Sequence, residues 1–199
     1  MDFSQIGAAL SVWLLPILLA ITLHEAGHGF AAQVLGDNTA KLQGRVTLNP
    51  LAHIDPFGTV ILPGLLLLTG AGFLFGYAKP VPVNWRNLRN PKRDMMLVAL
   101  AGPGTNIALA LLSVLILPIV SFLPPTSGEW LFHNLDAMVK FNILLAVFNM
   151  LPIPPLDGGR VAVGLLPRRP AMALARLERA GLFIVIGAFF LLPILLETV

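Results

Sequence analysis

The sequence His24-Glu25-Ala26-Gly27-His28 lies inside a long apolar stretch, residues 6–35, and decides how the rest of the chain is interpreted. On a helix, positions four apart lie about 40° apart around the axis and about 6 Å apart along it, so both imidazoles can reach one metal ion. Glu25 follows the first histidine directly and is free to act as a base. The stretch predicts a metal-binding helix with an acid–base group beside the metal.

The composition indicates a membrane protein. Of the 199 residues, 56% are hydrophobic and 12% are charged, with a mean hydropathy of +0.83, unlike a soluble globular domain. In hydrocarbon, two imidazoles and a carboxylate are costly unless they are paired or bind a metal, which disfavours reading them as ordinary helix residues. The chain has no Cys, so His, Asp and Glu are the strong zinc ligands available.

The basic character of the chain does not indicate nucleic acid. The net charge is +3 and the pI is near 9.8, but the basic residues lie in loops between apolar segments, as the positive-inside rule predicts. We expect no nucleic-acid partner. Residues 6–35 lack a basic leading region, so we do not expect a cleaved signal peptide.

Hydropathy predicts spanning helices over residues 6–35, 95–123 and 131–151, and a final helix over 181–196. Two other stretches are irregular. Residues 41–48 have weak strand character and predict a short β-hairpin. Residues 57–78 are apolar but are broken by glycine and proline, so we expect this stretch to re-enter the membrane without crossing it.

A third metal ligand is required, because a catalytic zinc site has three protein ligands and an open position. Asp157 is the natural candidate. It follows Pro152, Pro154 and Pro155 at the end of an apolar segment, where the chain should unwind and let a carboxylate turn back toward the bundle. A simple turn aspartate that caps Gly158 is the alternative that position alone leaves open.

Three separated pieces of sequence carry a family resemblance. They are His24-Glu25-Ala26-Gly27-His28, then Ala101-Gly102-Pro103 with Asn106, then Asn149-Met150-Leu151-Pro152-Ile153-Pro154-Pro155-Leu156-Asp157-Gly158-Gly159-Arg160. Together they resemble the site-2 protease family of intramembrane zinc metalloproteases. The resemblance implies peptide-bond hydrolysis within or near the membrane with one catalytic zinc ion. The implied ligands are His24, His28 and Asp157, with Glu25 as the general base.

Two asparagines are candidate catalytic residues. The resemblance implies that Asn149 holds the substrate backbone or the oxyanion, and Asn106 is a second candidate donor. An amide aimed at a developing oxyanion contributes roughly 3 kcal/mol in other proteases. Asn106 is equally expected to bond a neighbouring helix, and interhelical bonding is the favoured role for Asn142.

The two remaining histidines are weaker candidates. His53 lies in a polar loop, where it could approach the metal as a gate or an extra ligand. A hydrogen bond from His53 to Asp55 is the favoured alternative. His133 lies among polar residues at the far side of the predicted bundle, and we expect it to be an interfacial bystander.

The topology follows from the metal site. Both ligand-bearing segments place their ligands near their C-terminal ends, so an odd number of crossings must separate them. If residues 57–78 do not cross, Asp55 and Trp85 share one face with the basic clusters. The positive-inside rule makes this face cytoplasmic and places the active site toward the cytoplasmic half of the bilayer.

We therefore predict an all-α polytopic membrane protein, a helical bundle with a re-entrant segment and a short β-hairpin near the active site. Residues 1–199 form a single integral-membrane metalloprotease domain. The predicted function is a zinc endopeptidase acting on membrane-spanning or membrane-proximal proteins in the lipid bilayer of a prokaryotic inner membrane. Nothing in the sequence indicates an oligomeric state. A metal carrier or assembly factor is the alternative, but neither needs the base that Glu25 supplies.

Overall fold

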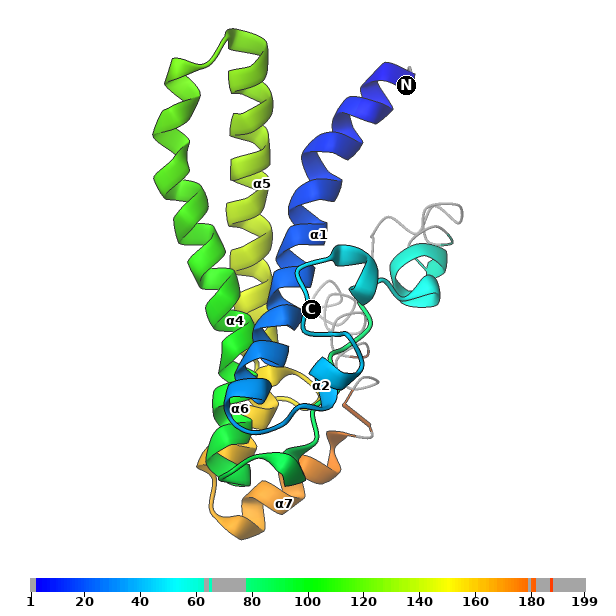
Figure 1. The fold of residues 1–199 in the computed structure, drawn as a ribbon, viewed down its shortest axis with the longest axis vertical. Helices are drawn as coiled ribbons and strands as arrows, with labels where there is room; N and C mark the ends of the chain where they lie inside the picture. The colour runs from blue at the N-terminus through cyan, green and yellow to red at the C-terminus, as the bar shows by residue number, and fades with distance from the viewer. Residues whose placement is uncertain (1–2, 63–64, 66–77, 179, 182–186, 188–199) are drawn as a thin grey trace, which may run out of the picture.

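The fold is helical, and three long helices dominate it. The computed structural model describes residues 3–62, 65, 78–178, 180, 181 and 187. The long helices are α1 (Phe3–Val34), α4 (Pro91–Ile116) and α5 (Pro125–Asn149). α1 and α5 run toward the same end of the molecule and α4 runs the opposite way (Figure 1). This is the parallel arrangement of ligand-bearing segments that the metal site required.

These helices are long and apolar enough to cross a membrane. Within the described residues the candidate spans are Ser11–Val34, Pro91–Phe122 and Pro125–Asn149. The second includes a short 3-10 continuation of α4, η4 (Leu117–Phe122). Large side chains such as Leu111, Leu115 and Leu144 are exposed on these helices, as expected for surfaces that contact lipid. The chain is a membrane protein, as its composition predicted.

Small side chains let the three helices approach closely. α4 packs against both α1 and α5, and α1 also packs against α5. The buried residues at these contacts include Ala20, Ala32, Ala99, Ala110 and Ala146. Small residues permit close backbone approach, which stabilises helices in lipid through van der Waals packing. The close approach brings α4 against the face of α1 that carries the histidines.

α1 ends where the sequence predicted a stop. Gly36 adopts a φ of +115°, a left-handed conformation that glycine accepts without a Cβ clash. The N–H groups of Gly36 and Asp37 donate to the carbonyls of Gln33 and Ala32, at 3.2 and 2.9 Å. These bonds satisfy carbonyls that the helix end would leave unpaired.

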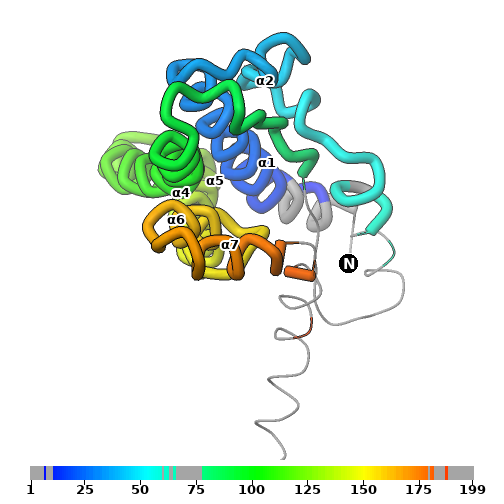
Figure 2. Tube along the Cα trace, turned by 90° about the horizontal axis from the view of Figure 1, so that it is seen from below, coloured from blue at the N-terminus to red at the C-terminus, as the bar shows by residue number. Residues whose placement is uncertain are grey.

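Two short helices close one end of the bundle. α6 (Asp157–Leu165) packs against α4, and α7 (Arg168–Arg176) packs against α6. Figure 2 shows both from below, beside the ends of α4 and α5. Asp157 is the first residue of α6, so the carboxylate enters the bundle from this end. The predicted helix over 181–196 lies outside the described residues, apart from residues 181 and 187.

The expected β-hairpin over residues 41–48 is wrong, and the described residues contain no strand. α2 (Thr39–Leu42) takes the first two of these residues, and turns follow through Gly44, whose φ is +66°. Local hydrogen bonds, such as Arg45 N–H to the Ala40 carbonyl at 2.9 Å, satisfy this backbone. The segment therefore has no need of a partner strand.

In the part of the connection between α2 and α4 that the structure describes, there are three short helical turns. They are η1 (Pro50–His53), η2 (Pro56–Ile61) and η3 (Trp85–Asn87). Side chains of Asn49, Asp55 and Asn84 cap their starts by accepting backbone N–H groups. Most of the expected re-entrant stretch, residues 57–78, lies outside the described residues, which include only 57–62, 65 and 78 of it.

Candidate metal centre

The two histidines of α1 point into the bundle from successive turns. Their ring atoms Nε2 lie 3.1 Å apart, and the residues are only 5% and 8% exposed. This is the geometry that the four-residue spacing predicted. Both imidazoles are therefore directed at one point in the bundle.

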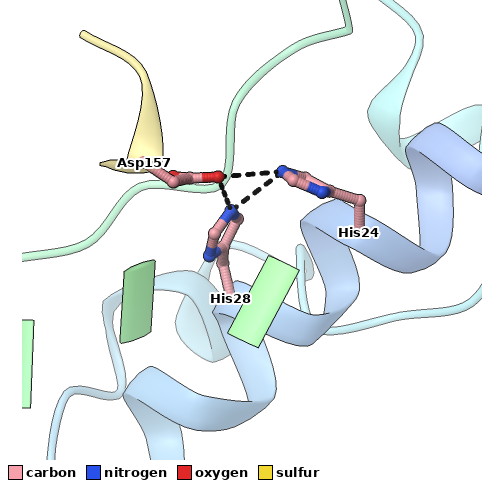
Figure 3. Close-up of side chains that lie close together, drawn as sticks. All are labelled: His24, His28 and Asp157. Atoms are coloured by element: carbon pink, nitrogen blue, oxygen red, sulfur yellow. Dashed lines mark hydrogen bonds and ion pairs between the residues drawn. The ribbon is translucent and has the colours of Figure 1, made fainter. Parts of the chain in front are cut away.

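Asp157 completes a triangle with them. Its Oδ2 atom lies 3.2 Å from Nε2 of His24 and 3.2 Å from Nε2 of His28 (Figure 3). The residue is 4% exposed. The tight turn before α6 depends on glycine, because a Cβ on Gly158 would collide with the Met150 carbonyl. The structure thus brings the third predicted ligand to the histidine pair.

The triangle fits a zinc ion. At bond lengths of about 2.0–2.1 Å, ligands at the corners of a tetrahedron lie about 3.3–3.4 Å apart. The three observed edges of 3.1, 3.2 and 3.2 Å are close to one face of such a tetrahedron. Oδ2 of Asp157 is buried and takes no hydrogen bond from the described residues beyond these two ring contacts. His24, His28 and Asp157 could therefore hold a metal ion.

The electrostatics favour an ionised Asp157. Burial alone would raise the pKa of this carboxyl group, but the two imidazoles, when they are protonated and no metal is bound, hold that pKa well below its ordinary value through hydrogen bonds and charge. A carboxylate with an unprotonated oxygen is the form that coordinates a cation.

Outer hydrogen bonds orient both imidazoles. Nδ1–H of His28 donates to the carbonyl of Val98 on α4 at 2.7 Å. Nδ1 of His24 lies 2.5 Å from Oδ1 of Asn106, also on α4. A proton on each Nδ1 leaves the Nε2 lone pair of that ring free to face the metal position.

Asn106 therefore lies beside His24, and its amide is fully engaged. Its Nδ2 group donates to the Ala20 carbonyl at 3.2 Å and to Oδ1 of Asn142 at 2.7 Å. Both amide hydrogens are used, so none is directed at a substrate oxygen. Asn142 makes the interhelical bond that the sequence favoured.

Glu25 is held by a loop segment that lies outside the three long helices. Its Oε2 accepts the backbone N–H of Val81 at 2.7 Å, and the residue is half-buried. Val81 belongs to residues 79–84, a segment without helix or strand that we call the strap. The strap is also bonded at its ends, through Lys79 N–H to the His53 carbonyl at 2.9 Å and through Asn84 N–H to Asp37 at 2.6 Å.

Three other residues considered from the sequence have contacts with partners other than His24, His28 and Asp157. Asn149 is the half-buried last residue of α5, and its Nδ2 donates to the Leu145 carbonyl at 3.1 Å. His53 bonds the Thr47 carbonyl at 3.1 Å, so the favoured bond to Asp55 is wrong. His133 is exposed and lies 3.9 Å from Glu129, consistent with a bystander.

Sequence reasoning missed two backbone groups and one glycine of this site. The groups are the Val98 carbonyl and the Val81 N–H, which carry no side-chain signal. Gly102 lies directly against both rings: an added Cβ would collide with Nε2 of His28 and lie 2.7 Å from Cε1 of His24. The family motif contained Gly102, but only the packing of α4 on α1 explains it.

Comparison with known proteins identifies the family of the chain. Residues 126–194 match the profile of Peptidase family M50. The chain is 37% identical over 182 residues to the "Putative zinc metalloprotease YwhC" of Bacillus subtilis (strain 168), covering 89% of this chain and 79% of that protein. No solved structure matches.

Two further relatives are longer than the matched region. The "Putative zinc metalloprotease Rip2" of Mycolicibacterium smegmatis is 33% identical over 171 residues, 85% of this chain and 62% of that protein. The Rip2 protein of Mycobacterium tuberculosis strain H37Rv is 36% identical over 141 residues, 71% of this chain and 52% of that protein. The chain belongs to peptidase family M50, the site-2 proteases, and is a zinc metalloprotease.

Proposed function

We propose that the chain is an intramembrane endopeptidase that hydrolyses peptide bonds of membrane-spanning or membrane-proximal proteins. One observation carries the proposal: ligand atoms of His24 and His28, on a helix that can span a membrane, converge at 3.1–3.2 Å with that of Asp157, the first residue of α6. Glu25 follows His24 on the same helix. In this proposal the three converging side chains are the zinc ligands. Zinc held there would polarise the scissile carbonyl and acidify water.

Glu25 is the proposed general base. It takes the proton of the attacking water and delivers it to the leaving amine nitrogen, so the carboxylate is regenerated in each cycle. The Val81 N–H fixes one carboxylate oxygen and leaves the other to face the reacting water. The strap thereby orients the base.

Asn149 is the proposed donor to the substrate. Among the described residues its amide nitrogen makes one hydrogen bond, to the Leu145 carbonyl, and we propose that its second N–H serves a substrate carbonyl or oxyanion. Asn106 contacts His24 and not the substrate, because its carbonyl oxygen faces Nδ1 of His24. We therefore assign Asn106 a positioning role in place of the direct catalytic role considered from the sequence.

The proposed location is a prokaryotic inner membrane, with the metal centre toward the cytoplasmic half. The triangle lies near the C-terminal ends of α1 and α5, the end of the molecule where α6 and α7 pack. Basic residues gather at this end, on α2, the start of α4, α7 and the connection before α4, and include Lys41, Arg89, Arg93, Arg168 and Arg169. Positive-inside orientation makes this end cytoplasmic.

The test is a cleavage assay on purified protein in proteoliposomes, with a panel of transmembrane peptides and with metal content measured by mass spectrometry. We expect about one zinc per chain and cleavage within or next to the apolar segment. His24→Ala and Asp157→Ala should each lose zinc and cleavage, because each removes one of three ligands. Full zinc occupancy in Asp157→Ala would refute the ligand set. Cleavage of soluble peptides alone would refute the substrate class.

A further inference from the structure

We propose that Asn142 is a positioning residue of the metal centre, acting through Asn106 on His24. The inference rests on the proposed function, in which His24 holds zinc. It assigns a role at this centre to a residue of α5 that does not touch the metal ligands. The role follows from a chain of buried hydrogen bonds that crosses α5, α4 and α1.

The chain of bonds is short and fully buried. Oδ1 of Asn142 lies 2.7 Å from Nδ2 of Asn106, and Oδ1 of Asn106 lies 2.5 Å from Nδ1 of His24. Both asparagines are 0% exposed. Buried polar groups are costly when they lack partners, so each bond in this chain depends on its neighbours.

The direction of the bonds is fixed by backbone carbonyls, which can only accept. The Met138 carbonyl lies 2.8 Å from Nδ2 of Asn142, and the Ala20 carbonyl lies 3.2 Å from Nδ2 of Asn106. Both amide nitrogens must face these carbonyls, so both amide oxygens face the other way. The oxygen of Asn106 then requires a donor on His24, which fixes the proton on Nδ1.

This arrangement explains how Asn142 can affect the affinity of the site for zinc. His28 is oriented by a backbone carbonyl, which α4 holds rigidly. His24 is oriented by a side chain that can rotate about its own bonds, so the orienting group must itself be held. Asn106 Nδ2 makes two hydrogen bonds, and the bond to Asn142 is shorter than the bond to the Ala20 carbonyl. Without the bond to Asn142, Asn106 can turn, and His24 can take the wrong tautomer.

A matched control lies on the same helix. Asn134 is also buried, at 5% exposure, and it also bonds the carbonyl four residues earlier, that of Trp130, at 2.9 Å. Its Oδ1, however, accepts no hydrogen bond from the described residues. Replacing Asn134 therefore removes a similar amide from α5 without touching the path to His24.

The experiment compares Asn142→Leu, Asn142→Asp and Asn134→Leu in the purified full chain. Zinc Kd is measured by chelator competition, and the absorption spectrum of the cobalt-substituted protein reports ligand geometry. Loss of an outer hydrogen-bond partner typically costs about 10–100-fold in metal affinity. We expect Asn142→Leu to weaken zinc binding by about ten-fold, the low end of that range, with an altered cobalt spectrum. Asn134→Leu should change neither.

Asn142→Asp provides the conservative rescue. A neutral carboxyl group at this buried position can accept from Asn106 and donate to the Met138 carbonyl, so zinc binding should stay near the wild-type value. Nitrogen NMR of the zinc-free protein gives a second readout: His24 should carry its proton on Nδ1 in wild type and in Asn142→Asp, and should show mixed tautomers in Asn142→Leu.

Two results would overturn the inference: unchanged zinc Kd and tautomer in Asn142→Leu, or equal losses in Asn142→Leu and Asn134→Leu. His24→Ala separates this failure from failure of the proposed function. If His24→Ala keeps zinc, the ligand assignment itself is wrong. If His24→Ala loses zinc while Asn142→Leu behaves as wild type, only the role of Asn142 is refuted.

Discussion

At the scale of single residues, Glu25 is where metal binding and hydrolysis can be separated. Its side chain bonds Val81 and belongs to no edge of the ligand triangle. We predict that Glu25→Gln keeps zinc and loses hydrolysis by at least about 100-fold, within the range that general-base catalysis contributes. Zinc content and cleavage rate, measured on one preparation, test this. Hydrolysis at the wild-type rate would eliminate Glu25 as the base.

Gly102 offers a steric test of the metal centre. A Cβ at this position would collide with His28 and crowd His24, whereas a Cβ on Gly104, two residues later, meets nothing within 4 Å. Gly102→Ala should therefore lose most of its zinc, while Gly104→Ala should keep it. Both changes raise helix propensity by up to about 1 kcal/mol, so propensity cannot explain a difference. Equal zinc contents would show that α4 does not pack against the rings in this way.

The residues of the site were largely predictable, and its backbone partners were not. The spacing of His24 and His28 and the need for a third ligand led to Asp157, because these side chains carry their chemistry in the sequence. The three candidate side chains lie together, and they could hold a metal ion. The Val98 carbonyl and the Val81 N–H could not be predicted, since every residue has such groups and only tertiary packing selects among them.

At the scale of elements, the strap offers a test of how the base is oriented. Val81 lies between Pro80 and Pro82 in a segment without helix or strand. The residue before a proline favours β or polyproline II backbone, so a proline at position 81 is compatible with its neighbours and removes the N–H. A hydrogen bond to a charged group contributes about 1.5–3 kcal/mol, so we predict that Val81→Pro lowers kcat by about ten-fold or more. Zinc content should not change.

The control for this prediction is Val81→Ala, which keeps the N–H and shortens the side chain. Its kcat should stay within about two-fold of wild type, since the bond to Glu25 remains. A loss in Val81→Ala as large as that in Val81→Pro would assign the effect to packing of the buried Val81 side chain against α1. The orienting role of the strap would then be withdrawn.

Elements that a continuous apolar run marks in the sequence were predicted better than elements that only weak strand propensity marks. Continuous apolar runs predicted α1, α4 and α5, because a membrane requires about 20 apolar residues in a helix. The hairpin over 41–48 was wrong because strand propensity is weak and depends on a partner. Here the N–H groups of Leu42, Gln43 and Arg45 find acceptors within five residues, so a turn satisfies the backbone locally.

At the scale of the whole molecule, Asp37 joins the end of α1 to the start of the α4 region. It is fully buried and accepts hydrogen bonds from Thr39, the N–H of Asn84 and the side chain of Asn87. Burial alone would raise the pKa of the Asp37 carboxyl, but these hydrogen bonds hold that pKa below its ordinary value. The folded state therefore favours the ionised carboxylate.

The free energy of unfolding should depend on pH through Asp37. Because the folded pKa of Asp37 is lower than the unfolded one, its contribution to stability is complete above about pH 4 and is lost as the pH falls below that value. Asp37→Asn should lower the free energy of unfolding by about 2 kcal/mol near pH 7, and its stability should fall less between pH 5 and pH 3. Unfolding in detergent tests this, with the exposed Glu129→Gln as control. Parallel pH profiles of Asp37→Asn and wild type would contradict it.

The topology around residues 57–78 remains a prediction, and its flanks support it. Lys79 N–H bonds the His53 carbonyl at 2.9 Å, so the two ends of the intervening stretch meet. A single crossing of a core about 30 Å thick would hold them apart. Cysteines introduced at exposed Leu51 and Arg86 should react with an impermeant thiol reagent from one face, and a cysteine at Glu129 from the other. Labelling of Leu51 and Arg86 positions from opposite faces would reject the re-entrant model.

The candidate zinc ligands are made in a fixed order as the chain is synthesised. The first two candidate ligands lie on α1, near the start of the chain, and the third lies on α6, after α5. During synthesis, a ribosome-bound chain that ends before Asp157 carries two candidate ligands and the proposed base but not the third candidate ligand. The order of ligands along the chain therefore delays hydrolytic activity until nearly all of the bundle has been inserted, and a prematurely ended product would be inert toward its neighbours in the membrane.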